Sequence, residues 1–269
     1  MEIGVSTASY FNKMQTEDAV TDIAAHGVPL CEIFLNSFCE YQPSFIQLLK
    51  SRLENTPLSV YSVHPMGTQF EPQLFSLHSR QRDDAWKLYE QVLQGAQAIG
   101  AGHYVMHGPA SMSGAARHIG LERVSPIFCD LADMARGYGV QLTLENVSWC
   151  IYRDPDFAAR LVDRIGTEKL KFTLDVKQAI RAGHRPEAFI DAVGGQMVNL
   201  HLCDAVTQED GAFQLAMPGA GNVDFASIRD RLREKGYAGP AFMEVYSDMF
   251  QDMSDLYESR ERMTALFNA

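Results

Sequence analysis

From end to end, the chain alternates between short apolar segments and longer amphipathic ones, and this alternation constrains the fold more than any other feature. The short segments are rich in the apolar and β-branched residues typical of strands, and the longer ones carry apolar residues at helical spacing. The predicted strands cover residues 3–6, 31–35, 58–64, 103–107, 140–145, 171–175, 197–201 and 240–244. The predicted helices cover residues 16–25, 44–53, 80–99, 121–138, 156–165, 186–193, 224–235 and 252–267.

Eight strand–helix pairs favour one architecture. Strands that alternate with helices pair in parallel through right-handed crossovers. Eight such pairs in 269 residues are typical of a closed (β/α)₈ TIM barrel rather than an open doubly wound sheet. No linker-like or low-complexity segment separates regions of different composition, so we expect a single α/β domain over residues 1–269.

The last four predicted strands each end in a side chain that can bind a metal ion. These side chains are Glu145, Asp175, His201 and Glu244. The carboxyl ends of barrel strands surround one mouth, so the four side chains should converge there. Three carboxylates packed together repel one another and raise each other's pKa, and a divalent cation would relieve this repulsion. We therefore expect one divalent ion per chain, with Mn²⁺ favoured and Mg²⁺, Co²⁺ or Zn²⁺ as alternatives.

The alternation of side chains along a strand provides a check on this site. If the four strand-end residues point into the barrel, then so do the residues two positions earlier. Three of these are polar, as expected beneath a hydrated ion site. They are Thr143, Thr173, Asn199 and Phe242.

Charge and composition narrow the classes of partner. A formal net charge of −11 argues against nucleic acid, whose affinity comes largely from Lys and Arg, and favours a small polar molecule. No apolar run approaches the roughly 20 residues that span a bilayer, and the N-terminus lacks a signal-like segment. We expect a cytoplasmic protein that does not bind membranes. The five cysteines are odd in number and include no C-x-x-C pair, which argues against a disulfide framework.

Several short motifs resemble those of a known superfamily. They are Leu144-Glu145-Asn146, the segments 174–178 (LDVKQ) and 201–204 (HLCD), the loop 218–225 (PGAGNVDF) and Met243-Glu244. Together they resemble the xylose isomerase-like TIM barrel superfamily, which includes ketose epimerases, enzymes that process hydroxypyruvate and inosose, and apurinic endonucleases. The resemblance spans the whole chain. It implies that Glu145, Asp175, His201 and Glu244 are the metal ligands and that Glu145 and Glu244 also act as acid and base.

The chain departs from this superfamily at one position and differs from its endonuclease branch at others. Gln178 stands where the family often has a histidine; glutamine can hydrogen-bond a substrate hydroxyl but cannot exchange a proton. His64 and His107 resemble additional histidine ligands of the endonucleases. That branch also carries a D-x-H motif, whereas residues 208–225 contain no histidine, so a three-metal site lacks ligands. We expect His64 and His107 to contact substrate, with a structural role as the alternative.

Three further residues have expected roles at the mouth. Lys177 would steady a developing oxyanion or be solvated, and Trp149 would form a wall of a sugar-sized pocket. Asp204 would hold His201 or the following loop in place, with an ordinary turn residue as the alternative. Many relatives form homo-dimers or homo-tetramers, and the same assembly is possible here.

These features predict a metal-dependent isomerase or epimerase. Its substrate would be a ketose or related hydroxy-ketone, and proton transfer would pass through an enediolate. Loss of hydroxide from the same intermediate would instead give a dehydratase of an inosose or similar keto-polyol. The sequence also leaves open a metal-dependent phosphodiester hydrolase like endonuclease IV and a non-catalytic sugar-binding barrel.

Overall fold

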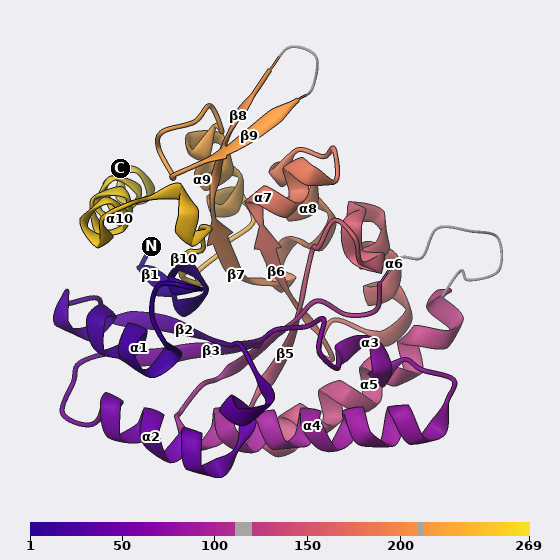
Figure 1. Cartoon of the computed structure of the whole chain (residues 1–269). Helices are drawn as coiled ribbons and strands as arrows, with labels where there is room; N and C mark the ends of the chain where they lie inside the picture. Colours follow the sequence, from indigo (N-terminus) through magenta and orange to yellow (C-terminus); the bar gives the residue numbers. More distant parts are fainter. Residues whose placement is uncertain (111–119, 209–211) are drawn as a thin grey trace.

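The structure is a computed structural model, and it describes residues 1–110, 120–208 and 212–269. Eight parallel strands form a closed barrel in the order β1-β10-β7-β6-β5-β4-β3-β2 (Figure 1). The barrel strands are β1 (Ile3–Ser6), β2 (Leu30–Leu35), β3 (Ser59–Pro65), β4 (His103–Met106), β5 (Gln141–Glu145), β6 (Lys171–Asp175), β7 (Met197–Leu202) and β10 (Ala241–Met243). The predicted (β/α)₈ barrel is therefore confirmed.

A long helix follows each barrel strand and packs on the outside of the barrel (Figure 1). These helices are α1 (Thr16–Ala25), α2 (Pro43–Leu53), α4 (Ser79–Ala98), α5 (Leu121–Gly137), α6 (Pro155–Ile165), α8 (Pro186–Val193), α9 (Phe225–Glu234) and α10 (Met253–Asn268). Their bounds lie within a few residues of the predicted ones. Within the described residues, no helix is long and apolar enough to cross a bilayer.

Two short helices and a β-hairpin lie in loops that follow barrel strands, and they were not predicted from the sequence. Two short helices, α3 (Glu71–Leu74) and α7 (Val176–Arg181), follow β3 and β6. Between β7 and α9, strands β8 (Asp204–Thr207) and β9 (Phe213–Ala216) form an antiparallel hairpin. Figure 1 shows this hairpin, in orange, projecting away from the barrel. Its strands are only four residues each, too short for a clear periodic signal.

The barrel interior near the carboxyl ends of the strands holds both apolar and polar side chains. Phe242 fills the interior beside Gly4, where a Cβ atom would lie 2.6 Å from the Phe242 ring and 2.5 Å from the Leu30 carbonyl oxygen. Thr143 and Thr173 are fully buried, and their hydroxyl oxygens lie 3.0 Å apart. These side chains face inward, as the alternation predicts, so polar groups lie directly beneath the strand ends.

Candidate active site

A pocket of about 280 Å³ opens at the carboxyl ends of the barrel strands. Strand register brings the predicted residues there: Asp175 is the last residue of β6 and pairs with His201 of β7. Glu145 is the last residue of β5, and Glu244 follows β10 directly. The predicted residues that line the pocket are His64, His107, Glu145, Trp149, Asp175, Lys177, Gln178 and Glu244.

The four predicted metal ligands converge on one point. Each offers one ligand atom, and these atoms all lie within 4.8 Å of one another. His201 is fully buried, and its Nδ1 lies 3.1 Å from Glu145 Oε1 and 2.5 Å from Glu244 Oε2. The same nitrogen lies 4.0 Å from Asp175 Oδ2. The side chains are thus close enough to share a single ion.

The donor set fits a divalent cation. Two buried carboxylate oxygens, Glu145 Oε2 and Glu244 Oε2, make no hydrogen bond within the described part of the chain, and the nearest groups to them are histidine nitrogens. A buried carboxylate oxygen is costly unless a positive charge faces it, and a divalent cation would supply that charge without requiring the histidines to be protonated. Carboxylate oxygens with one imidazole nitrogen suit Mn²⁺, Mg²⁺, Co²⁺ or Zn²⁺.

The electrostatics of the cluster show how its charge is balanced by protons and a lysine. Burial raises the pKa of Asp175 to about 7, against the opposing effect of Lys177. Burial also raises the pKa of Glu244, but His201 and Lys177 outweigh it and lower that pKa to about 2. Burial lowers the pKa of His201, but the carboxylates around it, Glu244 and Glu32 foremost, raise it well above its usual value.

Lys177 belongs to the cluster rather than to the surface. It lies in the first turn of α7 and is only 2% exposed, which excludes the solvated alternative. Its ammonium group contacts Asp175 Oδ2 and lies 2.9 Å from Glu244 Oε1. The lysine therefore neutralises two of the predicted ligands and faces the pocket at the same time.

Gln178 contacts the loop after β5 through its amide oxygen. This oxygen accepts hydrogen bonds from the backbone N–H and the hydroxyl of Ser148, at 3.1 Å and 2.8 Å. Only the amide nitrogen of Gln178 is left for a substrate hydroxyl. Trp149 is 38% exposed at the rim and packs edge-on against His107, with ring centroids 5.8 Å apart. It covers one side of the pocket.

His64 and His107 form a second cluster with Glu145. Their Nε2 atoms lie 2.8 Å apart, and His107 Nε2 lies 2.9 Å from Glu145 Oε2. His64 is buried, whereas His107 is partly exposed to the pocket. The three side chains are close enough to hold an ion of their own.

Asp204 holds the loop after β9. Its two carboxylate oxygens accept four backbone hydrogen bonds, of 2.7–3.1 Å. The donors are the amides of Ala205, Gly219, Gly221 and Val223. Of the two expected partners, this carboxylate thus contacts the loop and not His201.

Two residues at the site escaped the sequence analysis. Arg181 lines the pocket mouth and donates a 2.7 Å hydrogen bond to Tyr246 Oη. It lies on α7, a helix that was not predicted. Glu32 lies within β2 and contacts His201. The sequence does contain a signal for Glu32, which is the one carboxylate in the apolar segment 31–35 (CEIFL). A carboxylate in a buried strand indicates that a polar partner lies beside it.

Comparisons with known proteins agree with the fold. Residues 20–266 match the xylose isomerase-like TIM barrel family, and the chain belongs to it. An uncharacterized protein of Methanocaldococcus jannaschii is 23% identical over 97% of this chain and 87% of that protein.

Solved structures with the same fold include sugar epimerases. A D-tagatose 3-epimerase-like protein superposes with a TM-score of 0.82 at 20% identity, covering 100% of this chain and 97% of the other. The IolI protein with a bound zinc atom superposes with a TM-score of 0.83 at 14% identity, covering 100% of this chain and 98% of that one. The D-psicose 3-epimerase of Clostridium cellulolyticum H10 superposes with a TM-score of 0.76 at 17% identity, covering 100% of this chain and 98% of that one.

Proposed function

We propose that this protein is a metal-dependent isomerase or epimerase that acts on a ketose or a related hydroxy-ketone. The observation that carries the proposal is the convergence of Glu145, Asp175, His201 and Glu244 on one point at the floor of an open pocket. The similarity to ketose 3-epimerases supports the same class of substrate. The pocket volume of about 280 Å³ suits a small sugar rather than a polymer.

The four residues would hold one divalent ion, with Mn²⁺ favoured by the oxygen-rich donor set and Zn²⁺ as the alternative. The zinc atom in the similar IolI structure supports Zn²⁺ as this alternative. When bound, such an ion polarises a carbonyl group and offsets the negative charge that develops on its oxygen.

The residues of the chain would move the protons. Glu145 and Glu244 come from β5 and the end of β10, which β6 and β7 separate around the barrel. One carboxylate removes a proton from the carbon beside the carbonyl, and the other returns a proton from the opposite face, giving epimerisation. Return of the proton to the adjacent carbon gives isomerisation. The Lys177 ammonium group is placed to favour negative charge on a substrate oxygen.

The other predicted residues would orient the sugar. Gln178 offers its amide nitrogen, His107 a ring edge, and Trp149 an apolar wall. His64 lies deeper, against Glu145, with 3.5 Å between Nε2 and Oε2. Its contact with substrate would be limited to groups that reach the floor of the pocket.

The test is a screen of free and phosphorylated ketoses in heavy water with Mn²⁺. Exchange of one carbon-bound proton identifies both the substrate and the reacting carbon. Glu145→Gln and Glu244→Gln should each lower the exchange rate at least about 100-fold. Glu40→Gln is the matched control, because Glu40 is a buried carboxylate outside the pocket. Full-rate exchange in both site variants would exclude proton transfer by these two residues.

Metal-dependent hydrolysis of a phosphodiester is the second candidate, because Glu145 with His64 and His107 could hold another ion. Metal stoichiometry separates the two: one ion per chain favours the isomerase, and two or more favour hydrolysis. A dehydratase would reveal itself by a product lighter than the substrate by one water.

A further inference from the structure

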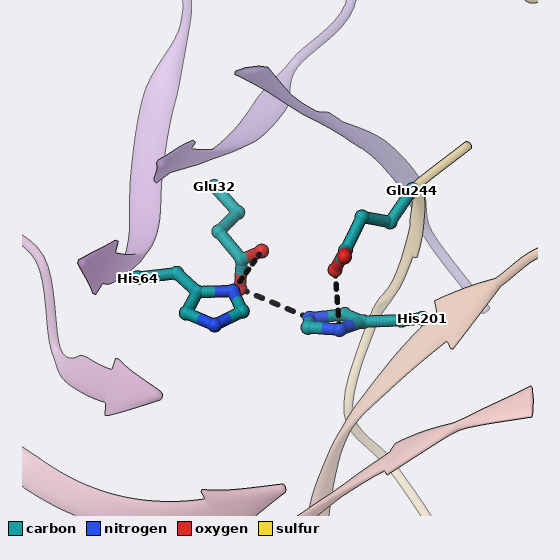
Figure 2. Close-up of side chains that lie close together, drawn as sticks. All are labelled: Glu32, His64, His201 and Glu244. Atoms are coloured by element: carbon teal, nitrogen blue, oxygen red, sulfur yellow. Dashed lines mark hydrogen bonds and ion pairs between the residues drawn. The ribbon is translucent and has the colours of Figure 1, made fainter. Parts of the chain in front are cut away.

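Glu32 is a fully buried carboxylate beneath the pocket, and the proposed reaction gives it no role. It lies in β2, far along the chain from the four predicted ligands, and is 0% exposed. Figure 2 shows its carboxylate between the rings of His64 and His201. A buried carboxylate is costly unless strong donors surround it, so its position calls for a physical reason.

Three neutral donors from three other strands fix the Glu32 carboxylate. Ser6 donates to Oε1 at 3.0 Å, and Ser62 and Asn199 donate to Oε2 at 2.7 Å and 3.2 Å. The fourth partner is the His201 ring, whose Nε2 lies 3.1 Å from Oε2. His64 Nδ1 also lies 3.6 Å from Oε1. Glu32 belongs to another group, with His64, His201 and Glu244, whose ligand atoms lie within 4.8 Å of one another. Both of its carboxylate oxygens already accept hydrogen bonds from protein donors, however, so its main role is to hold the groups around it.

The surroundings of the His201 ring decide which nitrogen carries the proton. Nε2 faces the Glu32 carboxylate, which only accepts, and lies 3.2 Å from the Asn199 amide nitrogen, which donates its own hydrogen bond to Glu32 Oε2. Because a carboxylate is a stronger acceptor than a neutral imidazole nitrogen, the Asn199 N–H bonds to Glu32, and Nε2 carries a proton that it donates to the same carboxylate. Nδ1 faces Glu244 (Figure 2) and also lies 3.1 Å from Glu145 Oε1. A histidine that donates from one nitrogen to a carboxylate has the other nitrogen oriented for a metal ion.

We propose that Glu32 is a positioning residue that holds His201 with its proton on Nε2 and aims Nδ1 at the cluster of Glu145, Asp175 and Glu244. The inference rests on the proposed metal site. It adds that the affinity of this site depends on a carboxylate that never touches the ion. Partners of this kind are typically worth 10–100-fold in metal affinity.

The experiment is a direct titration of the metal-stripped protein with Mn²⁺ and Co²⁺. Glu32→Gln keeps the size of the side chain but removes its charge. It should raise the dissociation constant of the metal roughly 10–100-fold. Glu40→Gln should leave it unchanged within about twofold. Glu40 is a matched control because it is 6% exposed, accepts hydrogen bonds from Thr16 Oγ1 and the Asn36 amide, and does not line the pocket.

The outcomes separate this inference from the proposed function. If the wild type binds no ion, the metal site fails and the inference fails with it. If the wild type and Glu32→Gln bind equally, the positioning role is wrong while the metal site stands. Should Glu32→Gln not fold, ¹⁵N NMR of the zinc-loaded wild type decides. A proton on Nε2 of His201 supports the inference, and zinc on Nε2 overturns it.

Discussion

Replacing Lys177 with methionine tests whether the charge cluster is built to hold a divalent cation. Lys177 is 2% exposed, and its ammonium group serves both Asp175 and Glu244. Methionine has a similar length and no charge, so Lys177→Met leaves two buried carboxylates without their cation. Removing one partner of a buried ion pair typically costs about 3–5 kcal/mol of the free energy of unfolding.

This cost translates into a large shift of the melting temperature. For a chain of this size, 1 kcal/mol corresponds to about 2–4 °C, so metal-free Lys177→Met should melt roughly 6–20 °C below the wild type. The shift should be larger at pH 9 than at pH 6. At the lower pH a proton on Asp175, whose pKa is raised to about 7, relieves the repulsion.

Manganese should restore much of the stability that Lys177→Met loses. An ion at 100 times its dissociation constant adds about 2.7 kcal/mol when it binds only the folded chain. In the variant the ion no longer meets a lysine ammonium group at the same carboxylates. Saturating Mn²⁺ should therefore raise the melting temperature of Lys177→Met more than that of the wild type.

Differential scanning calorimetry with EDTA and with Mn²⁺ measures both effects. Lys171→Met is the control, because Lys171 is half-buried outside the pocket and its ammonium group bonds to Gln196 Oε1 at 2.7 Å. Lys171→Met should lower the free energy of unfolding by at most about 1.5 kcal/mol. It should leave the rise in melting temperature caused by Mn²⁺ unchanged. The reasoning is refuted if metal-free Lys177→Met melts at the same temperature as the wild type, or if Mn²⁺ raises the melting temperatures of the variant and the wild type equally.

Three further predictions concern pH, packing and the loop after β9. Asp175 has a folded pKa of about 7 against 3.8 for an ordinary aspartate, so its contribution to metal-free stability is full below pH 3.8 and lost as the pH rises through 7. Metal binding near pH 6 should accordingly release protons, which calorimetric titration in two buffers of different ionisation enthalpy would detect. Gly4→Ala should cost about 1–3 kcal/mol in urea unfolding, because its Cβ would lie 2.6 Å from the Phe242 ring; an unchanged midpoint would contradict this packing. Asp204→Asn should speed hydrogen exchange at the Gly219 and Gly221 amides, and unchanged protection would show that Asp204 does not hold the loop.

The four predicted ligands could be located from sequence because barrel geometry removes the uncertainty of distance along the chain. Glu145 and Glu244 are 99 residues apart in sequence, yet both stand at the carboxyl ends of barrel strands. Once eight strand–helix pairs are recognised, strand ends must meet at one mouth. Approximate element bounds are sufficient, because a strand-end carboxylate remains near the mouth if a boundary moves by one residue.

Glu32 could not be located in the same way, because its role depends on strand register rather than on the order of the strands. Its donors Ser6, Ser62 and Asn199 come from β1, β3 and β7, and a shift of one residue in any of these strands would turn the donor to the other face. Arg181 was missed for a local reason. Helix α7 spans only six residues, and its N-cap is Asp175 itself, whose side chain accepts from the Gln178 amide.

The charges of the site explain why a cation and protons should compete for it. Four buried carboxylates, those of Glu32, Glu145, Asp175 and Glu244, face one lysine and the imidazoles of His64, His107 and His201. The carboxylates attract a protonated imidazole and so raise the pKa of His201 well above its usual value, and burial raises the pKa of Asp175, so protons supply part of the positive charge. A divalent ion bound there would supply this charge and would have to displace the proton from His201 Nδ1 to reach its lone pair. The proton on Nε2 stays, because Glu32 holds it. Metal affinity should therefore rise with pH in the wild type.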